Sequence, residues 1–464
     1  MSTVELKRPV VKDQASELIK TGRISSAVWF LAWPTIINTV FQTAHGIINR
    51  IFLGELESSR AAQAALGLGS MAPMIQFAMV YGISAGTSAL VSRYLGAEEQ
   101  ENAEESTRQS LIFAVFAGIL STVLLVVAAQ PFVRLLGAEG KVIEYAAGYT
   151  AIFGAASIPL CIMVIGTSAL RAAGDVKTPL YTGGTVVLCN VIFDWLLIFG
   201  IGPFPEMGIY GAALATAISY VFGMVLILWF LRKSVLRRSL NRLRIHINWF
   251  WKLLGIGWPA IIQQLQFSIS YSVYMLLIGM LDGATAIQAA LTIGLAIEST
   301  SFMPGAAYNI AATPLVGQNL GAGQPKRAER CAWYAARHAV IIMSVVAIVF
   351  LAIPEYLARI FTQDESVVRL IVSYLRINAV CQPFLAIGMV MSGALLGAGD
   401  TRMPTWIEFA TFYIIRLPLT WLLAIVFGWH ASGAWSAMCI SNVLYGILLT
   451  LWFMKGRWKY IQLH

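Results

Sequence analysis

The stretch Ala-Leu-Arg-Ala-Ala-Gly-Asp-Val-Lys-Thr-Pro at residues 169–179 returns later in the chain as Ala-Leu-Leu-Gly-Ala-Gly-Asp-Thr-Arg-Met-Pro at residues 394–404. The two copies lie 225 positions apart, and Trp33-Pro34 returns as Trp258-Pro259 at the same distance. A constant distance between separate matching segments is the mark of an internal repeat. We therefore expect the chain to consist of two copies of one structural unit.

The composition predicts that both copies lie in a membrane. The chain has 464 residues, of which 58% are hydrophobic and 12% charged, and its mean hydropathy is +0.73. Soluble globular domains carry about 25% charged residues. Polar side chains are too few here to cover a water-facing surface, which excludes a soluble enzyme and a disordered protein.

Apolar runs of the length that crosses a bilayer occur twelve times. A transmembrane helix needs about 20 mostly apolar residues. The runs are continuous and lack the alternation of membrane strands, so they predict an all-α transmembrane protein. They cover residues 27–53, 62–90, 110–130, 145–170, 180–201, 208–231, 252–281, 286–316, 333–353, 367–396, 405–427 and 432–454.

The positive charges predict the orientation of these helices. Of the 32 Lys and Arg residues, 24 fall in the N-terminal segment, the even-numbered loops and the C-terminal tail. Cytoplasmic loops of membrane proteins carry such an excess, so we expect both termini in the cytoplasm. The net charge of +9 is then explained by topology, and a nucleic-acid partner is not expected.

The repeat and the charges together predict the domain organisation. Because six helices are an even number, both copies enter the membrane in the same direction and are related by a pseudo-two-fold axis along the membrane normal. We expect the substrate path at their interface, as in secondary transporters. The predicted parts are a cytoplasmic N-terminal segment (1–26), a six-helix bundle (27–231), a basic cytoplasmic linker (232–251), a second six-helix bundle (252–454) and a cytoplasmic tail (455–464).

The repeated motifs resemble those of the multidrug and toxic compound extrusion (MATE) family of secondary transporters. The resemblance rests on Trp-Pro at the start of the first and seventh spans, on the two copies at 169–179 and 394–404, and on Asn190-Val-Ile-Phe-Asp194 in the fifth span. It implies that Asn190, Asp194 and Thr216 serve cation coupling. It also places the chain in a wider group that includes flippases of lipid-linked oligosaccharides.

Three of the 23 acidic residues fall inside predicted spans: Asp194, Glu298 and Glu408. A charge within the bilayer is costly and therefore indicates function by default. Asp194 lies one turn from Asn190 on the same helix face, and a carboxylate that alternates between water and a drier pocket can load and release a proton. The alternative role for Asp194 is a structural ion pair with Arg50.

The first span departs from the family pattern. Many members have an acid where this chain has Asn49, and Arg50 follows directly. Because Asn cannot release a proton and Arg50 disfavours a bound Na+, H+ is the preferred coupling ion, with Na+ left open. His45, one turn earlier, is a second candidate for proton handling, since imidazole titrates near neutral pH. No cofactor and no metal site are expected.

Polar residues form a stripe along the first span, and a similar stripe runs along its repeat in the seventh span. We expect both to line the substrate cavity, although polar stripes also join membrane helices to one another. The expected lining residues are Asn38, Gln42, His45 and Asn49 in the first stripe, and Gln263, Ser270 and Tyr274 in the second. Tyr308 is a further candidate, because aromatic rings stack on flat organic cations.

The second half offers two acids. Glu298 stands near the middle of its span and is a candidate for binding a cation or a proton, with a structural pair to Arg416 as the alternative. Glu408 lies about one turn from the cytoplasmic end of its span, where we expect it to be exposed to water.

These observations predict a cation-coupled antiporter that expels amphipathic, cationic organic compounds by alternating access. We expect a monomeric, multi-pass protein of a prokaryotic cytoplasmic (inner) membrane, with the lipid bilayer and a small organic molecule as partners. The alternative is a flippase of lipid-linked precursors, which would need several Arg or Lys residues around the cavity. A membrane sensor without transport activity is a third reading, but the sequence shows no attached soluble domain for it.

Overall fold

The computed structural model describes residues 14–54, 65, 67, 69, 73–135, 139–241 and 244–462. In α2 the side chains of Gln42, His45, Asn49 and Arg50 lie outside this described part. The described residues form helices and connections, without a strand. The expected all-α transmembrane fold is confirmed.

Two helical bundles follow one another along the chain, and we call them the N-lobe and the C-lobe. The N-lobe consists of α2 (Ile24–Gly54), α4 (Met74–Gly96), α5 (Gln100–Val127), α6 (Ala129–Leu135), α7 (Lys141–Ala155), α8 (Ser157–Ala172), α9 (Lys177–Ile198) and α10 (Gly208–Lys233). The C-lobe consists of α11 (Ile247–Gly279), α12 (Ala284–Gly321), α13 (Pro325–Ala352), α14 (Pro354–Arg359), α15 (Glu365–Ala379), α16 (Gln382–Ala398), α17 (Arg402–Phe409), η2 (Ala410–Arg416), α18 (Leu417–Thr420), η3 (Trp421–Val426) and α19 (His430–Met454). The short helices α1 (Gln14–Thr21), η1 (Arg237–Leu240) and η4 (Arg457–Tyr460) lie before, between and after the lobes.

The boundaries of the helices repeat with the period of the sequence. Both ends of α5 recur 225 residues later as the ends of α13. Within the described residues, nine helices are long and apolar enough to cross a membrane, and two further spans are each broken into a bent pair. The bend between α7 and α8 is 52°, and the bend between α15 and α16, at the same place in the repeat, is 58°.

One span differs between the copies. In the N-lobe α9 is a regular α-helix throughout, whereas the matching C-lobe span, residues 402–426, contains the two π-helical segments η2 and η3. π-Helical turns are rare and often occur at functional sites. Here η2 ends at Arg416, a charged residue inside a span.

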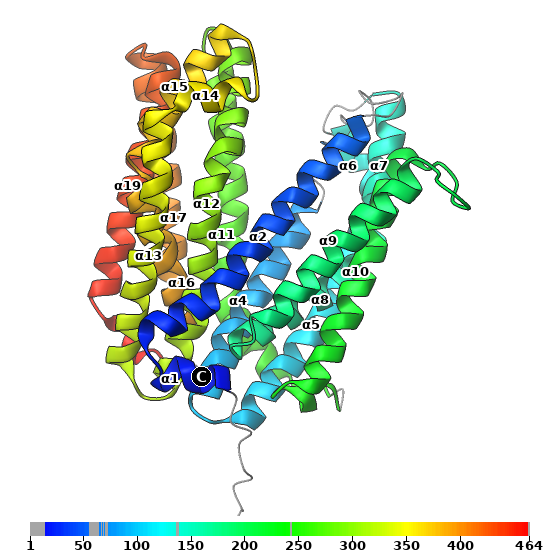
Figure 1. Ribbon diagram of the computed structural model, residues 1–464, viewed down its shortest axis with the longest axis vertical. Coiled ribbons are helices and arrows are strands. Elements are labelled where there is room, and N and C mark those ends of the chain that lie inside the picture. Colours follow the sequence, from blue (N-terminus) through cyan, green and yellow to red (C-terminus); the bar gives the residue numbers. More distant parts are fainter. Residues whose placement is uncertain are drawn as a thin grey trace, which may run out of the picture.

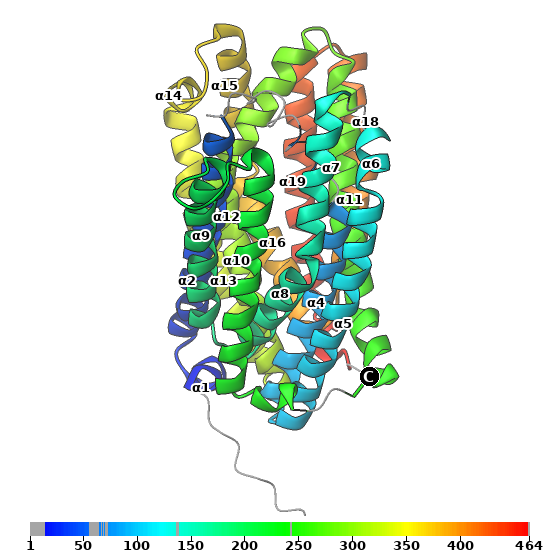
Figure 2. The ribbon, with the colours of Figure 1, turned by 90° about the vertical axis from the view of Figure 1, so that its right-hand side faces the viewer.

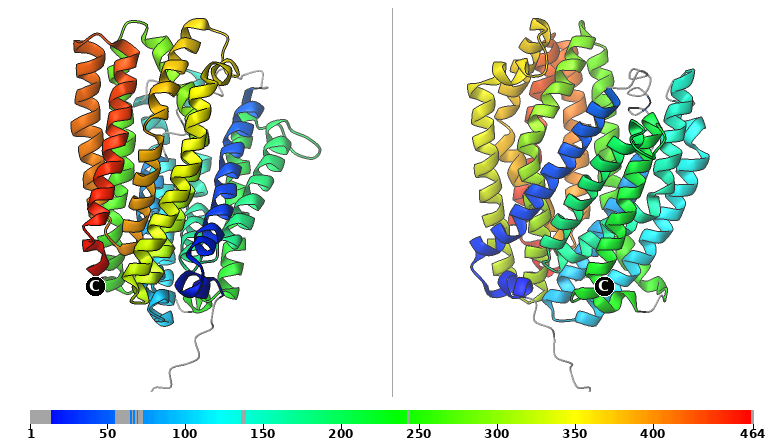
Figure 3. Two further views of the ribbon diagram at one scale, coloured as in Figure 1. Left: turned by 60° about the vertical axis from the view of Figure 1, so that its left-hand side comes forward. Right: turned by 45° about the vertical axis from the view of Figure 1, so that its right-hand side comes forward.

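The lobes lie close together at one end of the molecule and diverge toward the other (Figure 1). The end at which the lobes lie close together holds α1, the linker and the C-terminus, as the turned views also show (Figures 2 and 3). We call it the basic end, because its connecting segments carry Lys177, Arg237, Arg238, Arg457 and Lys459. The opposite end is called the open end.

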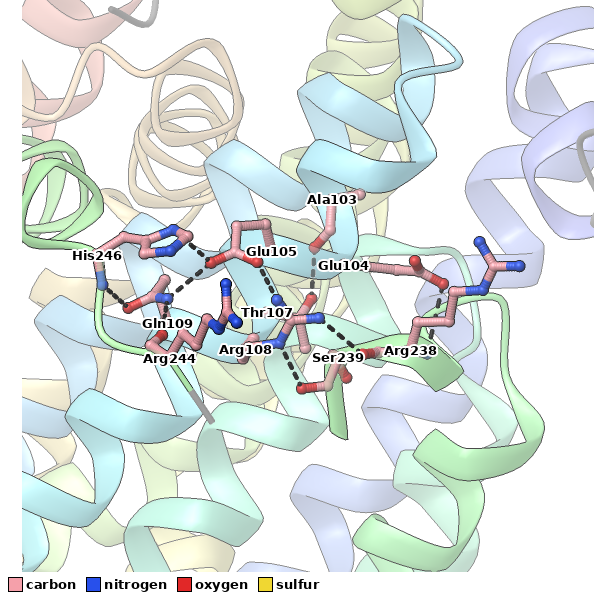
Figure 4. Close-up of polar contacts among 10 residues, drawn as sticks. All are labelled: Ala103, Glu104, Glu105, Thr107, Arg108, Gln109, Arg238, Ser239, Arg244 and His246. Atoms are coloured by element: carbon pink, nitrogen blue, oxygen red, sulfur yellow. Dashed lines mark hydrogen bonds and ion pairs between the residues drawn. The ribbon is translucent and has the colours of Figure 1, made fainter. Parts of the chain in front are cut away.

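The linker between the lobes is fixed to α5 of the N-lobe (Figure 4). Arg108 donates from Nε to the carbonyl of Ser239, at 3.2 Å. Gln109 donates to the carbonyl of Arg244 (2.6 Å) and accepts from the backbone N–H of His246 (3.2 Å). His246 directly precedes α11, so these contacts hold the linker to the N-lobe up to the first helix of the C-lobe.

Candidate functional site

A cavity of about 500 Å³ lies where the two lobes meet. Helices α2, α4, α8, α9 and α10 of the N-lobe line it together with α12 and α16 of the C-lobe. Its walls carry Asn38, Phe77, Tyr81 and Tyr220, and Asn309 faces them from α12. This volume and this mixture of aromatic and polar side chains are typical of sites for small organic molecules.

The floor of the cavity, on the side of the basic end, is built from matching positions of the two copies. Its members pair at a distance of 225 residues: Ser84 with Asn309, Ala85 with Ile310, Ser88 with Thr313, and Arg171 with Leu396. The pseudo-two-fold axis therefore passes through this floor. The pairs differ in charge at one position, where Arg171 of the N-lobe faces Leu396 of the C-lobe.

The structure brings together the three N-lobe residues that the resemblance implies for coupling. Asp194 lies on α9 and its side chain is completely buried. Asn190, one turn earlier, donates from Nδ2 to Oγ1 of Thr216 on α10, at 3.2 Å. Tyr149 of α7 is close enough to Asp194 for the two groups to interact electrostatically. The result is an enclosed polar site inside the N-lobe, with one carboxylate at its centre.

The site around Asp194 is separate from the cavity. The last α9 residue that lines the cavity is Val187, and Asp194 lies seven residues further toward the open end. Seven residues correspond to about two turns, or roughly 10 Å, along a helix. An ion at Asp194 and a molecule in the cavity would therefore influence one another through α9 and its neighbours, and not by direct contact.

Glu298, a buried acid of the C-lobe, has partners from its own lobe. Glu298 of α12 accepts hydrogen bonds from the hydroxyl of Tyr374 and from Nε2 of Gln382, the latter at 2.7 Å. The amide oxygen of Gln382 in turn accepts from Ser301, at 2.8 Å, which fixes its orientation. The carboxylate is thereby satisfied within the C-lobe.

Arg416 does not form the ion pair with Glu298 that was the alternative to a binding role of this acid. Its Nε donates to Ser441 (2.8 Å), and Nη2 donates to Asn442 (2.6 Å). The guanidinium also stacks on Phe412, at 3.9 Å from the ring centre. Because η2 turns the guanidinium toward α19, its charge is held by neutral acceptors on that helix and by the ring face of Phe412.

Sequence reasoning missed a pair of matching tyrosines. Tyr149 and Tyr374 occupy equivalent positions of the repeat; Tyr149 interacts with Asp194 and Tyr374 donates to Glu298. The constant distance of 225 residues was a signal that could have identified them.

The expected exposure of Glu408 is wrong. Its side chain is buried, with 6% exposed, and it accepts a hydrogen bond of 2.5 Å from Nε2 of Gln263. The reason is that α11 packs along α17 and covers this end of the span. Gln263, expected on the cavity wall, is used in this contact between helices.

The polar stripes divide into several environments. Asn38 lines the cavity. Tyr274 and Tyr308, expected on the cavity wall, are instead buried within the C-lobe, where Tyr274 donates to the carbonyl of Ala434 (2.9 Å) and Tyr308 packs against His338. Ser270 is also buried in α11. The expectations for Gln42, His45, Asn49 and Arg50 concern side chains outside the described part.

The lobes touch at the basic end through glycines at matching positions. A Cβ atom on Gly96 of α4 would lie 2.1 Å from the carbonyl oxygen of Gln318 on α12. A Cβ atom on Gly321 would lie 2.1 Å from the carbonyl oxygen of Arg93 on α4. The two contacts are related by the repeat, and both exist because neither position carries a side chain. They close the floor of the cavity.

Helix α1 reinforces this closure. Lys20 pairs with Glu98 of the N-lobe, at 3.3 Å, while Arg327 of the C-lobe donates to the carbonyl of Ile19, at 3.1 Å. Asn319 at the end of α12 donates to the same carbonyl, at 3.3 Å. A segment predicted only as an N-terminal extension thus binds both lobes at the basic end.

Comparisons with known proteins match the whole of this architecture. The model of the family described as MatE matches residues 34–196 and 259–422, which are the two halves of the repeat. The probable multidrug resistance protein NorM of Thermotoga maritima is 29% identical over 92% of both chains. A FAD transporter of Shewanella oneidensis is 26% identical over 90% of this chain and 91% of its own.

Solved structures share the fold. One described as the outward-facing conformation of a multidrug resistance MATE family transporter superposes with a TM-score of 0.90, covering 97% of this chain and all of its own, at 22% identity.

Proposed function

Because the chain belongs to the MatE family of membrane transporters, we propose that it is a proton-coupled antiporter that exports amphipathic, cationic organic compounds by alternating access. The observation that carries this proposal is the pairing of an enclosed acidic site with a separate cavity between two lobes. The acid supplies a place for the coupling ion, and the cavity supplies a place for the cargo. Both the acidic site and the cavity contain residues of α9, so movement of the N-lobe couples the occupancy of one site to that of the other.

The distribution of positive charge supports an orientation. Cytoplasmic segments carry an excess of Lys and Arg, so the basic end lies in the cytoplasm and the open end faces outward. Both termini are then cytoplasmic, and the contacts of α1, Gly96 and Gly321 close the cytoplasmic side. In this orientation the cavity is ready to release its cargo to the outside of a prokaryotic inner membrane.

Protonation of Asp194 is the proposed coupling step. The neutral acid tolerates an enclosed apolar environment, whereas the carboxylate requires polar partners or water, so the two forms favour different arrangements of α9 and α10. Rocking of the lobes then exposes the cavity alternately to each side. The available energy is about 2.3 kcal/mol for a proton crossing 100 mV. Each pH unit adds about 1.36 kcal/mol.

H+ is preferred over Na+ because the site offers few charged oxygen ligands. Among the described residues, Asp194 is the single carboxylate of this site, and Asn190 and Thr216 contribute neutral groups that bond to one another. Hard cations in proteins are usually held by several oxygen ligands, often carboxylates. A proton needs one.

The cavity favours an exporter of small molecules over a flippase. Arg171 is the one Lys or Arg among the residues that line the described cavity. A lipid diphosphate would be expected to need several. The names of relatives, multidrug resistance protein and FAD transporter, support organic molecules as cargo. We propose that the monomer is the transporting unit, because both lobes of one chain enclose the cavity.

Proteoliposomes with an acidic lumen test the coupling. With rhodamine 123 as a cationic probe and an imposed gradient of one pH unit, we expect uptake to approach about tenfold accumulation, since one exchanged proton per dye supplies that factor. A Na+ gradient of equal size should drive no uptake, and a protonophore should abolish the effect. Empty vesicles control for passive partitioning. Accumulation of the dye driven by a Na+ gradient alone would overturn H+ as the coupling ion. Accumulation with neither gradient would overturn the antiport.

A further inference from the structure

We propose that the floor of the cavity is a subsite for an anionic group, so that preferred cargo molecules carry a carboxylate or phosphate beside their apolar, positively charged body. The inference rests on the proposed transport function and names the cargo more closely. It is carried by Arg171, which sequence reasoning assigned to a cytoplasmic loop. The structure places it in the last turn of α8, lining the cavity.

Arg171 has no acidic partner in the described part of the chain. No described carboxylate lies within 4.0 Å of its guanidinium, since the ion pairs of the described residues involve other groups. The nearby Asp175 is used otherwise, because it accepts from the backbone N–H and the hydroxyl of Thr178. A charge kept within a span without a counter-ion indicates a function by default.

Two polar groups of the floor on the C-lobe side donate within their own lobe. Asn309 donates to the carbonyl of Met389 (2.6 Å), and Thr313 donates to that of Gly393 (3.0 Å). The hydroxyl proton of Thr313 and one of the two N–H groups of Asn309 are thus used within the C-lobe. The guanidinium of Arg171 retains five N–H groups in a planar fork, a geometry that matches both oxygens of a carboxylate or two oxygens of a phosphate.

The shape of the floor favours an amphiphile. Leu396, the repeat partner of Arg171, presents an apolar surface on the other side of the same floor. Phe77 and Tyr81 stand above it on α4, and both expose more than a third of their surface. A molecule with an anionic head at Arg171 and an aromatic body along α4 satisfies both surfaces, whereas a purely cationic molecule would meet the positive charge of Arg171.

A pair of dyes that differ only at the acidic group tests the proposal. Rhodamine 110 carries a free carboxylate, and rhodamine 123 is its methyl ester. We expect the purified wild-type protein to bind the acid more tightly than the ester, and Arg171→Gln to reduce this preference by at least about tenfold, since a charge-assisted pair contributes about 1.5–3 kcal/mol. Arg171→Lys should retain part of the preference, because it keeps the charge but loses the fork. Arg232→Gln, the same change at an exposed position in the last turn of α10 and outside the cavity, should leave the preference unaltered.

Both dyes are measured on one preparation, so an unfolded fraction changes neither Kd. Equal affinities for acid and ester in the wild type, or a preference that survives Arg171→Gln, would overturn the proposal. Transport of the ester would still stand in that case, which separates this failure from failure of the antiport. Added phosphatidylglycerol distinguishes a lipid phosphate from soluble cargo. If this lipid abolishes rhodamine 110 binding by the wild type but not by Arg171→Gln, the subsite is assigned to lipid and the proposal is overturned.

Discussion

The Asp194→Asn variant is expected to bind rhodamine 123 but to show no accumulation driven by a pH gradient, where the wild type approaches about tenfold for one pH unit. The amide has nearly the size of the carboxylate and can keep hydrogen bonds with its surroundings, so the packing of α9 against α10 should survive. It cannot exchange a proton at any pH of the experiment. The measurement is dye uptake into proteoliposomes with an acidic lumen, compared with passive equilibration.

The matched control is Glu206→Gln, the same type of change at an acid exposed in the connection between α9 and α10. It should retain the uptake of the wild type, since Glu206 lies outside the enclosed site. Undiminished accumulation by Asp194→Asn would remove Asp194 from the coupling mechanism.

Substitution of Gly96 or Gly321 by Ala is expected to disturb the closure at the basic end. Either new Cβ atom would lie 2.1 Å from a backbone carbonyl oxygen of the other lobe, so the helices have to separate. Overpacking of this kind costs about 1–3 kcal/mol, which shifts a two-state equilibrium roughly five- to 150-fold. We expect the arrangement with a closed basic end to lose population, and transport to slow accordingly.

Distances between spin labels at the open end measure this shift. Residues 206 and 282 are exposed there, one on each lobe, and can carry the labels after the five native cysteines are replaced. Separation of the lobes at the basic end should bring these labels closer together. Gly255→Ala is the control. Gly255 lies toward the same end of the molecule, and its Cβ atom would meet nothing within 4 Å. Equal distance distributions for Gly321→Ala and Gly255→Ala would contradict the proposed gate.

The fold was largely predictable because the repeat and the apolar runs are long-range signals. Matching helix boundaries, such as those of α5 and α13, follow from the spacing of 225 residues, which falls to 222 at the start of the last helices, α10 and α19. The bends within residues 145–170 and 367–396 were not predicted, since apolarity does not register a change of direction. Pro159 and Pro383, each near the start of the second helix of its pair, were the available signal, because proline lacks the N–H that continues a helix.

The candidate site was predictable only in part, because spacing gives a helix face but not the neighbour that covers it. Asn190, Asp194 and Thr216 meet as the resemblance implied. Glu408 was misjudged because its distance from a helix end says nothing about α11 packing over it. Arg171 was counted with loop charges, since a residue in the last turn of a span can face either water or the cavity.

The exchange of a proton for cargo is tested most directly by proton release from the purified protein. Saturating rhodamine 123 is added in weakly buffered solution with a pH indicator, and the same titration is made with Asp194→Asn. Linkage requires that a cargo favouring the deprotonated form displaces its proton. The expected result is release of up to about one proton per bound dye by the wild type and none by Asp194→Asn. Equal release by both proteins would contradict the account.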